Sequence, residues 1–120
     1  MGTGIESSSH KYGLIEDVCR AYELVISDGS LIRCSSEENP ELFRSIPWSH
    51  GSIGFLVAAE ICIVPARKFV KLIYEPLFSV NELIERFEKN SQDSGNDFVE
   101  AIVFSFDRAV LMTGMNFVIH

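Results

Sequence analysis

The residues best suited to chemistry lie in the first thirteen positions, where glycines alternate with hydroxyl side chains. Three glycines, Gly2, Gly4 and Gly13, free the main chain from the restrictions that a Cβ atom imposes. Hydroxyl groups lie between them, on Thr3, Ser7, Ser8 and Ser9. Such a loop can wrap a phosphate-bearing ligand, because it offers many hydrogen-bonding groups at close range. The alternative interpretation is that the glycines only shape turns.

Two side chains of the same stretch are candidates for acid–base chemistry or ligand contact. The imidazole of His10 belongs to the one side-chain type that ordinarily titrates near neutral pH. Its alternative role is a hydrogen bond within the loop. Tyr12 could stack on a ligand, or it could close the loop against a core. His50, beside Gly51 in a second glycine-bearing loop, has the same alternatives as His10.

A carboxylate and three thiols fall in apolar sequence. Glu60 lies within the apolar run 53–65. We expect it to form an ion pair with a Lys or Arg, because an unpaired buried charge is unfavourable. Cys19, Cys34 and Cys62 are odd in number and form no CxxC pair, which supports neither a disulfide framework nor a zinc site. We expect all three to be small buried hydrophobic residues.

The bulk composition excludes several classes of protein. With 120 residues, 47% apolar and 22% charged, the chain is one domain or parts of two. A net charge of -7 and ten scattered Lys and Arg residues argue against nucleic-acid binding. The longest apolar run, 53–65, is too short for a membrane-spanning helix, and no signal peptide is evident. We therefore expect a soluble chain.

The first half predicts a β-hairpin, a short helix and a buried strand. Residues 18–26 and 30–34 favour strands, and Asp-Gly at 28–29 is typical of a type I′ turn. A helix is predicted to begin at Asn39, as its cap, with Pro40 at its first position. It should end at Pro47. The run 55–64 lacks polar alternation, which predicts a central strand covered on both faces and ended by Pro65.

The second half predicts the order β-α-β-β. A strand at 68–75 precedes a capping box formed by Ser79 and Glu82, which opens an amphipathic helix ending near Asn90. Strands are predicted at 98–106 and 109–113, with a turn at 107–108. In the first of these, one face carries Phe98, Ile102, Phe104 and Phe106. This aromatic stripe is either core or the wall of an apolar ligand site.

Several features in order resemble the second half of the FAD-binding domain of the vanillyl-alcohol oxidase (PCMH-type) flavoproteins. They are the glycine-rich loop ending at Tyr12-Gly13, the hairpin turn at 27–29, the helix start at 39–43, and Gly51-Ser-Ile-Gly54 opening a strand that ends at Pro65. The stretches 1–13, 47–49, 54–61 and 69–72 are further similar to the sterol side-chain reductases of that superfamily. The resemblance covers residues 1 to about 114.

The resemblance implies an α+β fold in which residues 1–66 are the C-terminal part of the FAD-binding domain and 67–120 begin a substrate domain. It implies bound FAD, NADPH as electron donor, and reduction of the side-chain double bond of a sterol such as desmosterol. The flavin-binding positions that it implies are Gly2, Thr3, Gly4, Ile5, Glu6, Ser7, Ser8, Gly54 and Ile61. His10 and Tyr12 are the candidates for catalysis.

The resemblance also has consequences for the chain as a whole. The family's membrane anchor, first FAD subdomain and pyrophosphate loop find no counterpart here, and residues 115–120 do not follow the family pattern. We therefore expect an internal fragment, inactive and prone to aggregation by itself, of a protein of the endoplasmic reticulum membrane. The alternatives are another FAD-dependent oxidoreductase of the superfamily, or a non-enzymatic protein that binds partners through exposed strand edges.

Overall fold

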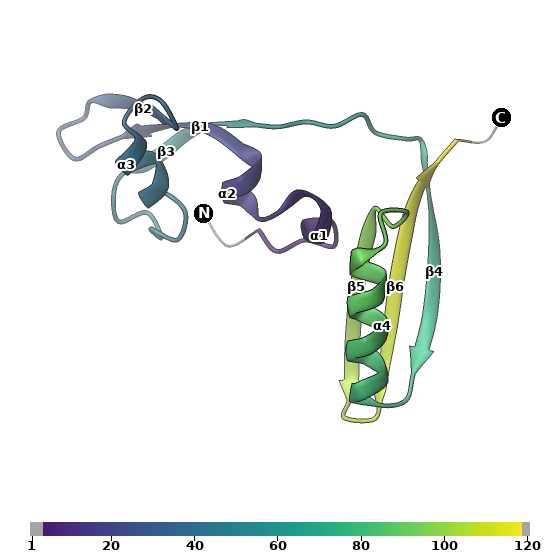
Figure 1. Ribbon diagram of the computed structural model, residues 1–120. Coiled ribbons are helices and arrows are strands. Elements are labelled where there is room, and N and C mark those ends of the chain that lie inside the picture. The colour runs from purple at the N-terminus through teal and green to yellow at the C-terminus, as the bar shows by residue number, and fades with distance from the viewer. Residues whose placement is uncertain (1–3, 119–120) are drawn as a thin grey trace. The chain divides into compact units, whose positions relative to one another are not determined.

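The computed structural model describes residues 4–118, which form short helices and two antiparallel sheets (Figure 1). In chain order the elements are α1 (Ser9–Tyr12), α2 (Ile15–Val18), β1 (Cys19–Val25), β2 (Leu31–Ser35), α3 (Pro40–Ser45), β3 (Phe55–Ile61), β4 (Phe69–Leu77), α4 (Val80–Gln92), β5 (Phe98–Ser105) and β6 (Arg108–Phe117). The predicted α+β class is confirmed, whereas α1 and α2 were not predicted.

The described residues divide into two compact units, each with its own sheet. The first unit comprises residues 4–6 and 12–64, and the second comprises 7–11 and 65–118. The short segment 7–11 therefore groups with the second unit, although the residues on both sides of it belong to the first. Each unit has a separate hydrophobic core.

In the first unit, β1 pairs with β2 as the predicted hairpin, but the turn is of another type. Gly29 has a positive φ of 84°, whereas Asp28 does not. The N–H of Gly29 donates to the carbonyl of Ile26, and the N–H of Ile26 donates to Ser30. This is a type I turn closed by a glycine bulge, which needs one left-handed residue where a type I′ turn needs two. The predicted type I′ turn is therefore wrong.

The core of the first unit lies where α2 and α3 pack on one face of its sheet. Its buried members are Cys19, Tyr22, Leu24, Cys34 and Ile46, with Ile15, Leu42 and Phe43 packed against them. The rings of Tyr22 and Phe43 lie 5.3 Å apart, centroid to centroid, within the range of attractive aromatic pairs. This packing fixes α3 over the centre of β1.

The short helix α3 forms as predicted, but Asn39 does not cap it. Asn39 adopts a left-handed conformation with φ of 49°, and its side chain makes no cap hydrogen bond. Instead its Nδ2 donates to the carbonyl of Arg33, 2.9 Å away. Pro40, which has no N–H to satisfy, begins the helix. The side chain of Asn39 thus ties the helix start back to β2.

The strand β3 is not the covered central strand that its sequence predicts. The order of the sheet is β2-β1-β3, so β3 is an edge strand, and most of its side chains are exposed. A continuous apolar run indicates that other layers of a protein cover both faces of the strand. The run does not identify those layers. Among the described residues, no layer covers the outer edge of β3.

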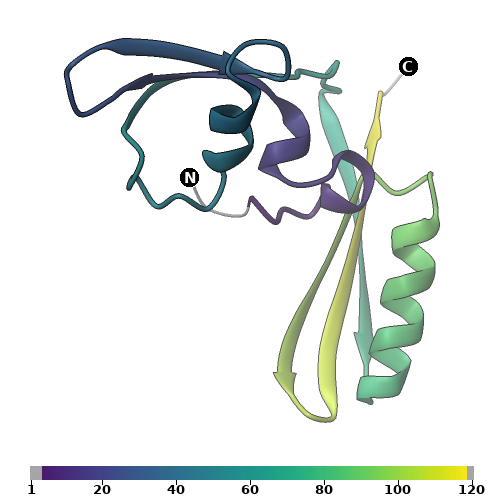
Figure 2. The same cartoon turned by 60° about the vertical axis from the view of Figure 1, so that its left-hand side comes forward.

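The second unit is a three-stranded antiparallel sheet with α4 along one face (Figures 1 and 2). The order is β4-β6-β5, so the last strand of the chain is central. Its core joins Leu77, Val99, Ala109 and Leu111 to Leu83 of α4. The strand predicted at 109–113 therefore extends further in both directions, because it pairs with strands on both sides.

The cap and the ion pair of α4 explain its position. The hydroxyl of Ser79 accepts a hydrogen bond from the N–H of Glu82 at 3.1 Å, as the capping box predicts. The carboxylate of Glu82 accepts from the N–H of Phe78 rather than from that of Ser79. On the sheet side, the Nε of Arg86 donates to Glu75 of β4 at 2.8 Å. These contacts anchor the first two turns of the helix.

Candidate cofactor and substrate site

The predicted flavin-binding loop is divided between the two units. Gly4, Ile5 and Glu6 belong to the first unit, whereas Ser7 and Ser8 belong to the second. Gly2 and Thr3 lie outside the described residues. Within the second unit, the carbonyl of Ser7 accepts a hydrogen bond from the N–H of Val99 at 2.7 Å. The loop is thus tied to the start of β5, and its contact with a flavin stays a prediction.

Two of the predicted flavin-binding glycines meet atoms of their own unit. A Cβ atom at Gly4, whose φ is 63°, would lie 2.8 Å from the Cβ atom of Ile15. A Cβ atom at Gly54 would lie 2.8 Å from the carbonyl oxygen of Val25. Real Cβ atoms essentially never approach so closely, so both positions require glycine without any ligand. The alternative of structural glycines therefore has a physical basis at these two positions.

Within the second unit, the side chains of His10 and Lys11 bind the two residues that precede β5. The Nε2 of His10 lies 3.1 Å from the carbonyl oxygen of Asn96, an arrangement in which the imidazole donates. The ammonium of Lys11 lies 2.5 Å from a carboxylate oxygen of Asp97. This hydrogen bond, with a second from the N–H of Asn116, holds the pKa of Asp97 below its usual value. The catalytic roles of His10 and Tyr12 stay predictions.

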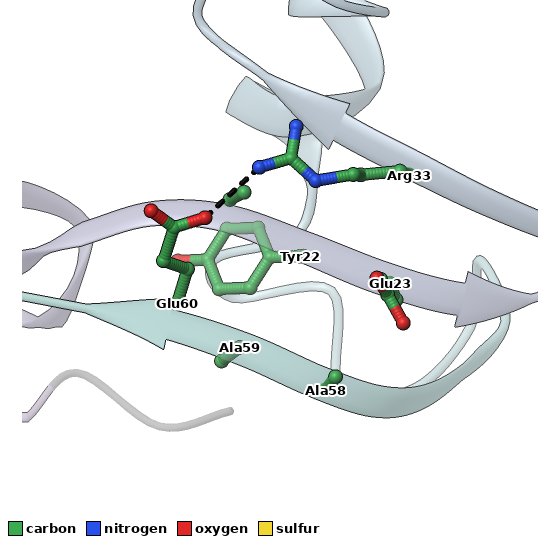
Figure 3. Close-up of a pocket in the computed structure, with 7 residues that line it drawn as sticks. Tyr22, Glu23, Arg33, Ala58, Ala59 and Glu60 are labelled. Atoms are coloured by element: carbon green, nitrogen blue, oxygen red, sulfur yellow. Dashed lines mark hydrogen bonds and ion pairs between the residues drawn. The ribbon is translucent and has the colours of Figure 1, made fainter.

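The carboxylate of Glu60 has the basic partner that the sequence predicts. The guanidinium of Arg33 reaches over β1 from β2 and lies 2.9 Å from Glu60 on β3, as Figure 3 shows. This hydrogen bond raises the pKa of Arg33. The partner belongs to the neighbouring β-hairpin of the same unit. Both side chains are well exposed, so the pair contributes little to stability.

The Arg33–Glu60 pair borders a hollow of about 240 Å³ on the outer face of the first sheet. Small side chains form its floor, those of Ala21, Ala58 and Ala59. Arg33 supplies its positive charge, and the carboxylates of Glu60 and Glu38 already face that guanidinium. The hollow is therefore poorly suited to a phosphate group, because its cation is already neutralised.

The three cysteines divide into two environments. Cys19 and Cys34 are buried as predicted, and burial raises the pKa of the Cys34 thiol. Cys62 is exposed, and its sulfur accepts a hydrogen bond from the Nε of Arg20 at 2.8 Å. The prediction of a buried residue is wrong for Cys62, because it follows the last residue of an edge strand. Within residues 4–118, no cluster of His, Cys, Asp and Glu is arranged to hold a metal ion.

The outer edge of β3 exposes both apolar side chains and main-chain hydrogen-bonding groups. Phe55, Val57 and Ile61 are each at least half exposed along this strand. Its second edge pairs with none of the described strands, so main-chain N–H and C=O groups are available there. A flavin ring has apolar faces and a hydrogen-bonding rim. The predicted contact at Ile61 therefore fits the exposed edge, and the described residues are compatible with a flavin.

Glu100 is a further candidate that the sequence analysis did not select. It lies on β5, on the sheet face opposite α4, between the apolar residues Phe98 and Ile102. The interpretation of the stripe 98–106 rests on its aromatic and aliphatic side chains alone. The sequence does contain a signal for Glu100, because it is a charged residue at one position of an otherwise apolar alternation. A charge facing an apolar surface is unfavourable, so its presence there indicates a specific role.

The sequence is similar to curated delta(24)-sterol reductases from animals and plants. It is 56% identical to the delta(24)-sterol reductases of Mus musculus and Homo sapiens over 115 residues, which are 96% of this chain and 22% of theirs. The Pisum sativum enzyme is 39% identical over 94% of the chain. The chain closely resembles delta(24)-sterol reductase. The resemblance to this branch of the flavoproteins is thereby confirmed, over about a fifth of the length of these relatives.

More distant similarities lie outside the sterol reductases. A D-arabinono-1,4-lactone oxidase of Yarrowia lipolytica is 38% identical over 66 residues, 55% of this chain and 12% of its own. The fold matches that of 6-hydroxy-D-nicotine oxidase from Arthrobacter nicotinovorans with a TM-score of 0.61, 20% identity, and coverage of 96% of this chain and 27% of the other. No protein-family model matches the chain. The named relatives are oxidoreductases, which supports the predicted class.

None of the helices within residues 4–118 combines the length and the apolar character that crossing a bilayer demands. The longest, α4, has 13 residues.

Proposed function

We propose that this chain supplies part of the flavin site and the beginning of the substrate domain of an FAD-dependent sterol reductase. The observation that carries the proposal is the 56% identity to delta(24)-sterol reductases over 96% of the chain. Its enzyme would reduce the side-chain double bond of a sterol of the desmosterol type. NADPH would be the electron donor, and the full-length protein would associate with the endoplasmic reticulum membrane.

FAD would contact the first unit along β3 and the segment before it. The exposed edge of β3, with Ile61 near its end, offers main-chain hydrogen bonds and apolar contact. Ile5 and Glu6 are also exposed and precede the short helices. When bound, FAD supplies the capacity to accept a hydride and to deliver it to a second substrate. The residues of this chain hold and orient it, and they exclude water.

A segment exchange tests the proposal in a complete enzyme. The matched segment of mouse delta(24)-sterol reductase is replaced by this chain, and the unmodified mouse enzyme is the control. The proposal predicts that the chimera retains stoichiometric FAD and oxidises NADPH when desmosterol is added. A chimera that folds as the mouse enzyme does, yet holds no FAD or does not respond to desmosterol, would contradict the proposal.

A second candidate function is an FAD-dependent oxidase of the same superfamily acting on another substrate. It is favoured by the 38% identity to the D-arabinono-1,4-lactone oxidase, which falls on 55% of the chain. The same chimera distinguishes the two candidates. Flavin reduction by D-arabinono-1,4-lactone in place of NADPH, without turnover of desmosterol, would favour the oxidase.

A further inference from the structure

The helix-free face of the second sheet is apolar and exposed. In the strand register, the transverse rows on this face are Leu72–Gly114–Phe98, Tyr74–Met112–Glu100 and Pro76–Val110–Ile102. The face opposite carries Glu75, Leu77, Val99 and Leu111, which contact α4. Apart from Glu100, these rows present a continuous apolar surface, and an exposed surface of this kind marks a site of interaction with a ligand, a membrane or another protein.

Side chains of this surface on both edge strands are largely exposed to solvent. Leu72 is 52% exposed, Tyr74 61% and Ile102 45%. The four alternate positions of β4 that face this way span residues 70–76, about 20 Å at the rise of a β-strand. That length suits an elongated hydrocarbon ligand. A compact polar ligand would leave most of the surface in contact with water.

Gly114 gives the surface a shallow centre. A Cβ atom there would lie 3.0 Å from a ring carbon of Phe98 and 3.1 Å from a methyl group of Leu72. The two side chains therefore converge over the central strand, where a larger residue would separate them. The result is a smooth apolar floor next to the row that holds Glu100.

Glu100 is the charged residue in these three rows. No hydrogen bond or ion pair joins its carboxylate to another residue of the described range 4–118. The phenol of Tyr74 lies in the same row on the far strand, with its Cα atom about 10 Å away at the usual strand spacing. The carboxyl group of Glu100 thus lies beside an apolar surface and has no hydrogen-bond partner among the described residues.

Reduction of a carbon–carbon double bond requires one hydride and one proton. The hydride brings the electron pair to one alkene carbon, and the other carbon takes a proton from an acid. A carboxylic acid that gives up this proton ends as a carboxylate and regains a proton from solvent. The donor must therefore carry its proton when the alkene is bound, and it must lie within hydrogen-bond reach of the carbon that it protonates.

We propose that the helix-free face of the second sheet holds the hydrocarbon of the sterol, and that Glu100 is the acid that protonates the alkene carbon. The proposal rests on the proposed function, from which it takes the sterol and the hydride donor, a reduced flavin. Its own observations are the apolar rows, the convergence over Gly114 and the unpaired carboxylate.

The first arm of the test measures proton transfer in the mouse chimera. The flavin is reduced beforehand and mixed with desmosterol, and its reoxidation is followed. E100Q should slow reoxidation by about 10²–10⁴-fold, the usual contribution of a general acid, and leave reduction by NADPH unchanged. The control E85Q removes an exposed carboxylate of α4 and should react as the wild-type segment does. Normal reoxidation in E100Q, or a loss confined to Y74F, would overturn the assignment.

The second arm measures sterol binding without turnover, from the fluorescence of dehydroergosterol. L72D places a carboxylate on the helix-free face and should weaken binding by at least about tenfold, since hydrocarbon solvates a charge poorly. I73D makes the same change on the opposite face of β4, at a similarly exposed position, and should bind normally. E100Q should bind as tightly as wild type.

Equal binding by the two aspartate variants would show that the sterol lies elsewhere. Dimers that dissociate in L72D and not in I73D would show that a second copy covers the face. Either result overturns the proposal. If the wild-type chimera reduces desmosterol while these variants behave alike, the proposed function stands and only this inference fails. If the wild-type chimera has no sterol activity, the proposed function fails first.

Discussion

Substitution of Gly54 by alanine separates a structural role from a cofactor role. The added Cβ atom would meet the carbonyl oxygen of Val25 at 2.8 Å, a main-chain atom that moves only if β1 moves. Overpacking of this kind costs about 1–3 kcal/mol, whereas the loss of glycine's freedom in the unfolded chain returns about 0.4–1 kcal/mol. The expected net destabilisation of the first unit is about 1–2 kcal/mol.

The assay is chemical denaturation followed by tryptophan fluorescence, because Trp48 is the single tryptophan and lies in the first unit. G95A is a control for the glycine-to-alanine change itself and should leave this transition unchanged, since Gly95 lies in the second unit and a Cβ atom there would meet only the side chain of Asp93, at 3.2 Å. A G54A chain as stable as wild type, within about 0.5 kcal/mol, would refute the steric argument. If the corresponding chimera then lost FAD, Gly54 would be required by the flavin instead.

Three further predictions concern individual side chains. Because the pKa of Asp97 is lowered in the folded chain, its contribution to stability is present above the ordinary value near pH 3.9 and is lost as the pH falls through the lowered folded value. Acid denaturation of D97N should therefore show a weaker dependence on pH below about pH 4, and an unchanged dependence would contradict this. With a thiol reagent under native conditions, exposed Cys62 should react first, and the buried Cys19 and Cys34 only on unfolding; three equal rates would be inconsistent with the fold. Replacing the capping hydroxyl in S79A should destabilise the second unit by about 1 kcal/mol in a denaturant titration followed by helical circular dichroism, and a change near zero would show that the cap bond is not formed.

Local signals in the sequence predicted much of the fold. The capping box at Ser79 and the Asp-Gly turn depend on neighbouring residues, and both elements formed where expected. The details that failed depend on contacts beyond the local sequence. Asn39 binds the carbonyl of Arg33, because β2 brings that carbonyl within reach, so it does not cap its own helix.

Burial was predictable only where the covering layer lies within the chain. The apolar sequence of β3 indicates covered faces, yet the strand lies at a sheet edge with Cys62 exposed just beyond it. The same reasoning applies to the aromatic stripe of β5, which alternation alone could not assign to core or ligand wall. Strand register places Glu100 and Ile102 on the face without a helix, outside the core under α4, and their contact with a ligand stays a prediction.

The prediction of the candidate site depended more on the family resemblance than on the sequence pattern. Composition and spacing suggest a phosphate-bearing ligand at the opening loop, but FAD, NADPH and a sterol followed only from the resemblance. In the structure Gly4 and Gly54 are explained by close contacts with Ile15 and Val25. The flavin contacts predicted for the loop therefore need a direct test of cofactor binding.

Product analysis of the mouse chimera tests the central claim most directly. The chimera carrying this chain is incubated with desmosterol and NADPH, and the sterols are separated by mass. The account predicts FAD retained by the protein and a product two mass units heavier, formed only when NADPH is present. A chimera that retains FAD, and is reduced by NADPH, yet returns desmosterol unchanged would contradict the assignment of this chain to a sterol reductase.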